Sequence, residues 1–153
     1  MAASKRRQII EAIVARLAAI DGSGEFETKA GEQIFMNELP PFGPDDPDYA
    51  IAVQYGDDLP TVQQGKVLHV LTVVLLALAR VDLQYDEDPM IVAERVLADI
   101  QRAIELADRD LGGLVDRELL AGPIQTAEME AGATSCGVQV AYVVHYQRSW
   151  GSP

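Results

Sequence analysis

The sequence predicts an α+β fold, with a mostly antiparallel mixed β-sheet of about four to six strands and two main helices packed on one face. Three observations support this. Residues 66–81 form a long apolar run rich in Val, Leu and Thr, which is typical of a central strand. Residues 137–147 alternate between the two faces of a strand. Two separate segments repeat apolar residues at helical spacing, one near the N-terminus and one that begins at Pro89.

The composition fits one soluble domain that spans residues 1–153. Of the 153 residues, 48% are hydrophobic, which is enough to build a core. The net charge of −12, from 24 acidic and 12 basic residues, disfavours nucleic-acid binding through phosphate contacts. Cys136 is the only cysteine, so an intrachain disulfide is excluded, and a reducing compartment is expected.

The first helix is predicted to begin after Ser4, a good N-cap, and to end near Ile20 at Asp21-Gly22. Glu11 and Arg16 interrupt its apolar residues, so we expect a helix and not a signal peptide. The basic residues at its start either form a solvated first turn or contact an acidic neighbour; they are Lys5, Arg6 and Arg7. Two short strands are expected next, at residues 25–29 and 33–37.

A segment with four prolines and one glycine, residues 39–48, excludes regular structure. We expect this segment to project from the domain and to contact a neighbouring molecule. A strand is predicted at residues 49–55, and a polar loop at residues 56–65.

The central strand at residues 66–81 is apolar on both of its faces. One face carries His69, Leu71, Val73, Leu75 and Ala77, and the other carries Leu68, Val70, Thr72, Val74, Leu76 and Leu78. Both faces therefore need cover. A buried helix is the alternative interpretation, because residues 75–79 are Leu and Ala. A membrane span is not expected, since such spans need about 20 apolar residues.

The second helix is predicted to begin with Asp88 as its N-cap and Pro89 in the first position, and to end at Gly112-Gly113. A short helical turn is expected at residues 114–120, and a strand at residues 123–130. In the last strand, the residues that face one side are Val138, Val140, Tyr142, Val144 and Tyr146, and those that face the other are Gln139, Ala141, Val143 and His145.

The residues give no pattern typical of an active site. His69 and His145 lie in predicted strands without a second His or Cys at metal-ligand spacing, which favours histidines of the core or the sheet. The acidic runs 45–48 and 82–88 lack the ligand spacing of a calcium loop. The sequence has no P-loop, no GxGxxG and no nucleophile elbow. We therefore expect no catalytic residue, no cofactor and no metal.

The layout of the elements resembles the phage tail terminator (tail completion) protein family of long-tailed phages. The segments that carry the resemblance are RRQIIEAIVARL, ELPPFGPDDPD followed by YAIAVQY, GKVLHVLTVVLLALA, PMIVAERVLADIQRAIE, GPIQTAEMEAG and GVQVAYVVHY. The resemblance covers nearly the whole chain. It implies a structural virion protein whose copies form a hexameric ring. Such a ring terminates the tail tube and joins it to the head, and it carries no catalytic residues.

The resemblance also implies the partners. These are further copies of the chain, the tail tube protein and a head-completion or connector protein, with DNA passing through the ring without being specifically bound. The expected location is the virion tail, and the host cytoplasm during assembly. The residues expected at interfaces are Lys5, Arg6, Arg7, Pro40, Pro41, Phe42, Asp45, Asp46 and Trp150.

The residues themselves agree with a partner, because two helices cover only one face of a sheet whose central strand is apolar on both. An acidic ring would also repel the phosphates of passing DNA. Two alternatives stay open. One is a small-molecule-binding or enzymatic α+β domain with a pocket on the uncovered sheet face near His69 and His145. The other is a cytosolic adaptor that binds a peptide along an edge strand.

Overall fold

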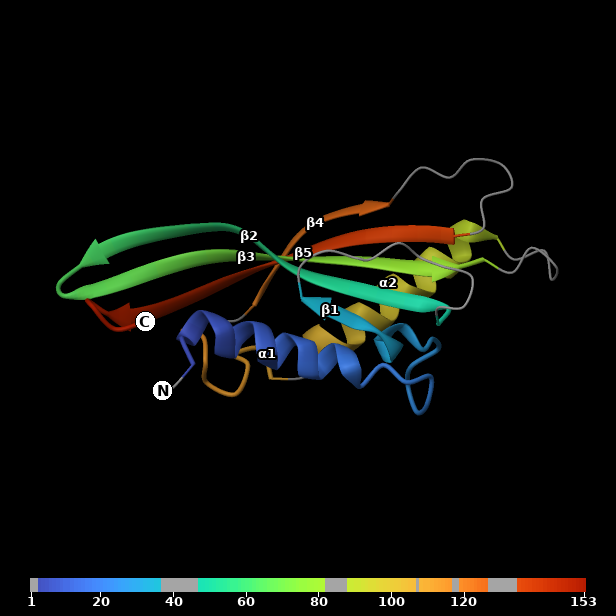
Figure 1. Cartoon of the computed structure of the whole chain (residues 1–153), viewed down its shortest axis with the longest axis horizontal. Helices are drawn as coiled ribbons and strands as arrows, with labels where there is room; N and C mark the ends of the chain where they lie inside the picture. The colour runs from blue at the N-terminus through green and yellow to red at the C-terminus, as the bar shows by residue number, and fades with distance from the viewer. Residues whose placement is uncertain (1–2, 37–46, 82–87, 107, 117–118, 127–134) are drawn as a thin grey trace.

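The computed structural model describes residues 3–36, 47–81, 88–106, 108–116, 119–126 and 135–153. The elements in chain order are α1 (Lys5–Ala18), the 3₁₀ turn η1 (Ala30–Glu32), β1 (Ile34–Met36), β2 (Tyr49–Gln63), β3 (Lys66–Arg80), α2 (Pro89–Glu105), β4 (Leu120–Thr126) and β5 (Ser135–Ser149). Figure 1 shows both helices beneath the same face of one sheet.

The strands form a single five-stranded sheet in the order β1-β2-β3-β5-β4. β1 pairs in parallel with β2, whereas the other three pairings are antiparallel. β3 lies at the centre, as its apolar composition indicates. The predicted fold class, a mostly antiparallel mixed sheet with two helices on one face, is confirmed, and the helical alternative for β3 is wrong.

Burial alternates strictly along β3 and identifies the face that the helices cover. Every second residue is buried, and those from Leu71 to Ala79, including Val73 and Leu75, belong to the same core cluster as the helix residues Ile13 and Ile100. The residues between them are only partly buried, and they are Leu68, Val70, Thr72, Val74, Leu76 and Leu78. We call the sheet face that carries this second set the open face.

β2, β3 and β5 are each 15 residues long, well beyond the usual five or six. Their far ends project past the helices as a three-stranded arm (Figure 1). At its tip, Gln64 and Gly65 have φ angles of +51° and +77°, as a two-residue type I′ hairpin requires. The arm is made of the far half of β2 from Gly56, the first half of β3 and the end of β5.

The arm corrects the prediction of a polar loop at residues 56–65. Residues 58–63 pair with residues 66–71 of β3, after a bulge between Tyr55 and Asp58. A Cβ on Gly56 would lie 3.1 Å from the carbonyl oxygen of Thr72, so the glycine permits the close approach of the two strands at the bulge. The residues beyond the bulge are exposed, since neither α1 nor α2 covers them, and their sequence shows no apolar alternation. The sequence therefore lacks the pattern that predicts a strand.

Both helices begin at the predicted caps. The Ser4 hydroxyl accepts a hydrogen bond from the backbone N–H of Arg7 (3.3 Å), and the Asp88 carboxylate accepts one from that of Met90 (2.9 Å). Their ends were predicted too late. α1 stops at Ala18, although Ile20 is still fully buried.

α2 stops at Glu105, well before Gly112-Gly113. Its end is held by Arg16 of α1, which donates a hydrogen bond to the carbonyl oxygen of Ile104 (3.3 Å). Residues 108–116 form turns instead of a helix, anchored by the buried side chains of Leu111 and Val115.

The predicted strand at residues 25–29 is wrong, because Asp99 of α2 holds this segment as a loop. The Asp99 side chain is fully buried and accepts hydrogen bonds from the backbone N–H groups of Glu27 (3.1 Å) and Thr28 (2.7 Å). It also accepts from the Thr28 hydroxyl (2.7 Å) and from Arg102 (2.8 Å). Four donors thus compensate one buried carboxylate.

The later strands begin earlier than predicted, since β5 spans Ser135–Ser149 and not residues 137–147. β4 begins at Leu120, three residues before the expected start, and the predicted end at residue 130 lies outside the described residues. In β5 the set predicted to share one face with Val138 is the buried one, and it belongs to the core cluster. Among the residues that the structure describes, no helix is both long and apolar enough to cross a membrane.

Candidate functional site

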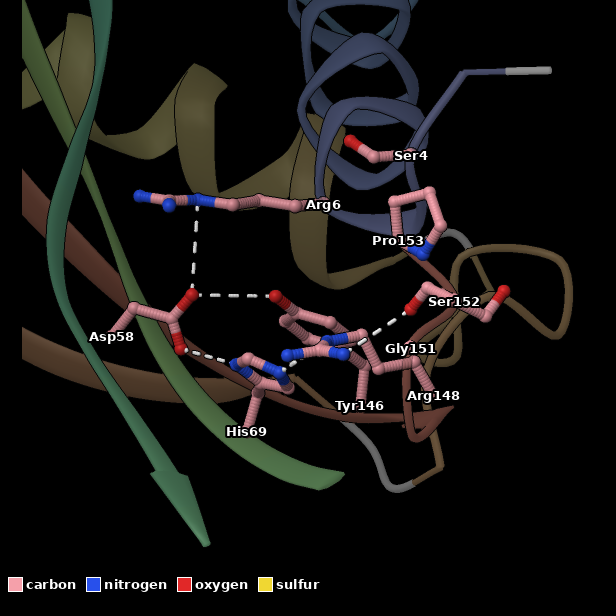
Figure 2. A pocket seen from close by; sticks show the side chains of 9 residues that line it. All are labelled: Ser4, Arg6, Asp58, His69, Tyr146, Arg148, Gly151, Ser152 and Pro153. Carbon is pink, nitrogen blue, oxygen red and sulfur yellow. Dashed lines mark hydrogen bonds and ion pairs between the residues drawn. The ribbon is translucent and has the colours of Figure 1, made fainter. Parts of the chain in front are cut away.

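A cluster of polar side chains lies on the arm, on the same side of the sheet as the helices and beside the start of α1 (Figure 2). Figure 2 shows its members from four parts of the chain: Asp58 of β2, His69 of β3, Tyr146 and Arg148 of β5, and Arg6 of α1. We call these five residues the arm cluster. The strand register explains it, since His69 pairs with Tyr146 and the neighbouring Leu71 pairs with Asp58.

Both ring nitrogens of His69 are occupied. Nε2 accepts a hydrogen bond from Nε of Arg148 (3.0 Å), and an arginine nitrogen is always the donor. The ring proton therefore sits on Nδ1, which donates to the Asp58 carboxylate at 2.8 Å. A histidine that acts as a general base needs a free nitrogen that faces its substrate. In this arrangement the acceptor nitrogen of His69 already faces Arg148.

Tyr146 completes the surroundings of Asp58. Its hydroxyl donates to the second carboxylate oxygen of Asp58 (3.3 Å), and its ring stacks on His69 with centroids 4.5 Å apart and planes 4° apart. Burial, together with the negative charge of Asp58, raises the pKa of Tyr146 to about 12. The phenol therefore stays protonated near neutral pH and remains a donor to Asp58.

The basic start of α1 is tied to the arm of the same chain. Nε of Arg6 lies 3.8 Å from Asp58, an ion-pair distance that is too long for a hydrogen bond, and its guanidinium carbon lies 4.0 Å from the ring centroid of Tyr55. Lys5 donates to the carbonyl oxygen of Gln147 (3.2 Å). For Arg6, the acidic neighbour considered from the sequence is therefore Asp58 of the same chain. Arg7 pairs with Glu11 at the surface (2.8 Å).

A pocket of about 460 Å³ opens between the arm cluster, Ser4 and residues 151–153 (Figure 2). Arg148 forms one wall and donates a second hydrogen bond to the carbonyl oxygen of Ser152 (3.2 Å). The arm cluster thus joins α1, all three strands of the arm and the segment after β5. The donors and acceptors of the cluster bond to one another, and this arrangement fixes the arm relative to the helices.

The open face is the second candidate site. Along β3 it presents an apolar row that the helices do not reach, and the register places Ala52 and Phe35 on one side of Leu76. On the other side, Ala141 lies opposite Val74. A sheet face exposed to water normally carries mainly polar residues, whereas between Leu68 and Leu78 the β3 row of this face has only one polar residue, Thr72.

The other predicted interface residues differ in their outcome. Trp150 follows β5 directly and is 69% exposed. The remaining ones fall in the proline-rich segment and lie outside the described residues; they are Pro40, Pro41, Phe42, Asp45 and Asp46.

A pocket of about 580 Å³ near His69 and His145, as considered from the sequence, is lined by both residues, although their side chains do not share a face of the sheet. His145 pairs with Val70, the residue next to His69, so the two imidazoles point to opposite faces. In the described part of the chain, no group of three or more His, Cys, Asp or Glu side chains is placed to hold a metal ion.

Sequence reasoning missed the residues that matter most in the arm cluster. Asp58 was assigned to a loop, and Tyr146 and Arg148 had no recognised partner. Asp99 carried a usable signal, since it lies on the apolar stripe of its helix between Val96 and Ala103. A charged residue in such a position predicts a buried polar partner.

No protein-family model matches this chain, and no curated protein matches it. Its function is therefore inferred from the geometry of its own residues, together with the resemblance described above.

Proposed function

We propose that this chain is a structural virion protein whose copies form a ring that terminates a phage tail tube and joins it to the head. The resemblance supplies the number of copies, six, and the two further partners, the tail tube protein and a head-completion or connector protein. The protein works in the virion tail and assembles in the host cytoplasm. The observation that carries the proposal is the open face, whose central strand remains apolar although neither α1 nor α2 covers it (Figure 1).

The open face has the character of a protein–protein interface. Its β3 residues alternate with a fully buried set, so they belong to a rigid strand at the centre of the sheet. Contiguous uncovered apolar surface on a folded domain marks an interaction site. A rigid surface also loses little conformational entropy on binding, which favours assembly.

The charge of the chain supports passage of DNA without retention. The net charge is −12, and binding to duplex DNA depends on free Lys and Arg side chains that contact phosphates. Arg6 pairs with Asp58, and Lys5 donates to the main chain of Gln147, so the basic start of α1 is engaged within the chain. The remaining field repels phosphates.

The proposal is tested by measuring solution mass over a range of concentrations and ionic strengths, followed by electron microscopy of the protein alone and with phage tail tubes. We expect closed rings with sixfold symmetry, either free or seated on the tube ends. A protein that stays monomeric under all conditions and binds nowhere, or only along the sides of the tubes, contradicts the proposal.

A further inference from the structure

Two features of the arm lack a partner within the described residues and are chemically complementary. Nδ1 of His145 is buried without a hydrogen-bond partner, and the side chain of Trp150 is 69% exposed. We propose that Trp150 of one copy inserts beside His145 of a second copy and donates its indole N–H to this nitrogen. The inference rests on the proposed ring and names the contact that joins its neighbours.

The receiving site is a recess of about 580 Å³ on the arm. Its walls include Thr61, Leu68, Val70, Asp116, His145 and Gln147. We call it the His145 recess. The register places Thr61, Leu68 and Gln147 in one row of the open face, and Val70 and His145 in the next. The volume lies within the range of about 300–1,000 Å³ typical of ligand pockets, so an indole has room.

The unpaired nitrogen of His145 specifies what should enter. A neutral imidazole carries one proton, and when that proton is on Nε2, Nδ1 is an acceptor. A buried acceptor without a donor lowers stability, and a partner that supplies an N–H removes this cost. The indole of Trp can only donate, and its apolar ring suits the side chains of Leu68 and Val70.

Trp150 is held in place before it binds. Its backbone N–H donates to the carbonyl oxygen of Gly65 at the arm tip (2.9 Å), and Ser152 N–H donates back to Ser149 (3.0 Å). Only the side chain is free to move, so little entropy is lost on docking. Tryptophan is also enriched among the residues that contribute most to binding at interfaces.

If the occupant of the recess is Trp150, it has to come from another copy. Trp150 lies five residues beyond His145 along an extended strand, a separation of about 16 Å at about 3.3 Å per residue. A contact between two different surfaces of identical chains is heterologous, and repetition of such a contact closes a ring when the rotation permits. The arm of each copy would thus present its Trp150 to one neighbour and its His145 recess to the other.

The inference is tested by disulfide cross-linking between two differently tagged full-length chains, one with Ser152→Cys and one with Thr61→Cys. Both positions are exposed, and both substitutions leave Trp150 and His145 intact. We expect the mixed disulfide to form readily. Adding Trp150→Ala to the first chain, or His145→Leu to the second, should lower its yield about tenfold or more.

The matched control replaces Ser152→Cys by Ser23→Cys, at an exposed serine in the loop after α1. Equal yields from the two serine positions, or a yield unchanged by Trp150→Ala, overturn the inference. At concentrations at which the chains are monomeric, thermal unfolding of His145→Leu should match that of the unmodified protein, since an unpaired group is removed. Sixfold rings that form without this cross-link support the proposed function and overturn the inference. The cross-link without rings supports the inference and contradicts the proposed function.

Discussion

Arg148 of β5 donates a hydrogen bond from Nε to Nε2 of His69 on β3, across 3.0 Å. Through its other ring nitrogen, Nδ1, His69 donates a hydrogen bond to Asp58 (2.8 Å). Asp58 also accepts a hydrogen bond from the Tyr146 hydroxyl (3.3 Å). Three strands are thereby linked through one imidazole. Asp58 is the common acceptor and the only carboxylate of the arm cluster.

Asp58→Ala should therefore destabilise the protein. The side chain is 14% exposed, and its loss leaves His69 and Tyr146 without their acceptor and Arg6 without its ion-pair partner. An unpaired buried donor costs about 1–3 kcal/mol, so we expect a fall of that order in the free energy of unfolding. Urea denaturation measures it. The matched control is the exposed neighbour Asp57, whose replacement by Ala should change stability by less than about 0.5 kcal/mol; equal effects would contradict a special role for Asp58.

Val73 and Val74 are neighbours on β3 that face opposite sides, and the structure decides which is which. Val73 is fully buried beneath the helices, so Val73→Asp should cost about 3–5 kcal/mol and prevent folding. Val74 lies on the open face, so Val74→Asp should leave a folded chain that does not assemble. Circular dichroism and solution mass distinguish the two. If both variants misfold alike, the open face is not free for a subunit contact.

Asp99→Ala should loosen the loop at residues 25–29 from α2. The substitution leaves the N–H groups of Glu27 and Thr28 and the Arg102 guanidinium without their acceptor. We expect a loss of about 2–4 kcal/mol, since several buried donors are affected at once. Thermal unfolding and hydrogen exchange of the loop provide the measurement. Glu94→Ala, on the exposed side of the same helix, serves as the control and should have little effect.

Stability should fall in strongly alkaline solution because of Tyr146. Its pKa is raised from 10.0 to about 12 by burial and by Asp58, so the folded state keeps a proton that the unfolded state loses. The stabilisation is fully present below about pH 10 and is lost as pH rises towards about 12, at up to about 1.4 kcal/mol per pH unit. Denaturation at several pH values should show this slope, and Tyr146→Phe should reduce it. An unchanged slope in the variant would exclude Tyr146 as its source.

Burial and the nearby carboxylate of Glu105 raise the pKa of Tyr142 as well, so part of the alkaline slope should remain in Tyr146→Phe. Ultraviolet titration of the tyrosines in the folded protein should then show two late phenols, one of which disappears in that variant.

Duplex DNA should not be retained at physiological salt. Non-specific binders reach dissociation constants of about 10⁻⁴ to 10⁻⁶ M through free Lys and Arg, and this chain carries a net charge of −12. Fluorescence anisotropy with a duplex checks the expectation. Micromolar, salt-sensitive binding would contradict it and would point to Lys5, Arg6 and Arg7 as phosphate contacts.

The sequence by itself determined the features that depend on neighbours along the chain. Ser4 and Asp88-Pro89 identify the starts of the helices because a cap and its N–H partner are two or three residues apart. The composition of residues 66–81 predicts a strand that is apolar on both faces, and with it the fold class. These are local properties, because they depend on residues that lie close together in the chain.

Only the tertiary structure decided which face of β3 the helices cover, how far β2 extends and where Asp58 finds its partners. Asp58 lies 11 residues from His69 and 88 from Tyr146, and no local periodicity encodes such pairs. Beyond residue 55, β2 owes its extended form to pairing with β3, since its own side chains there are mostly exposed. Strand pairing is formed by main-chain hydrogen bonds between two strands, so the pairing with β3 and not the side-chain pattern of β2 fixes the length of β2.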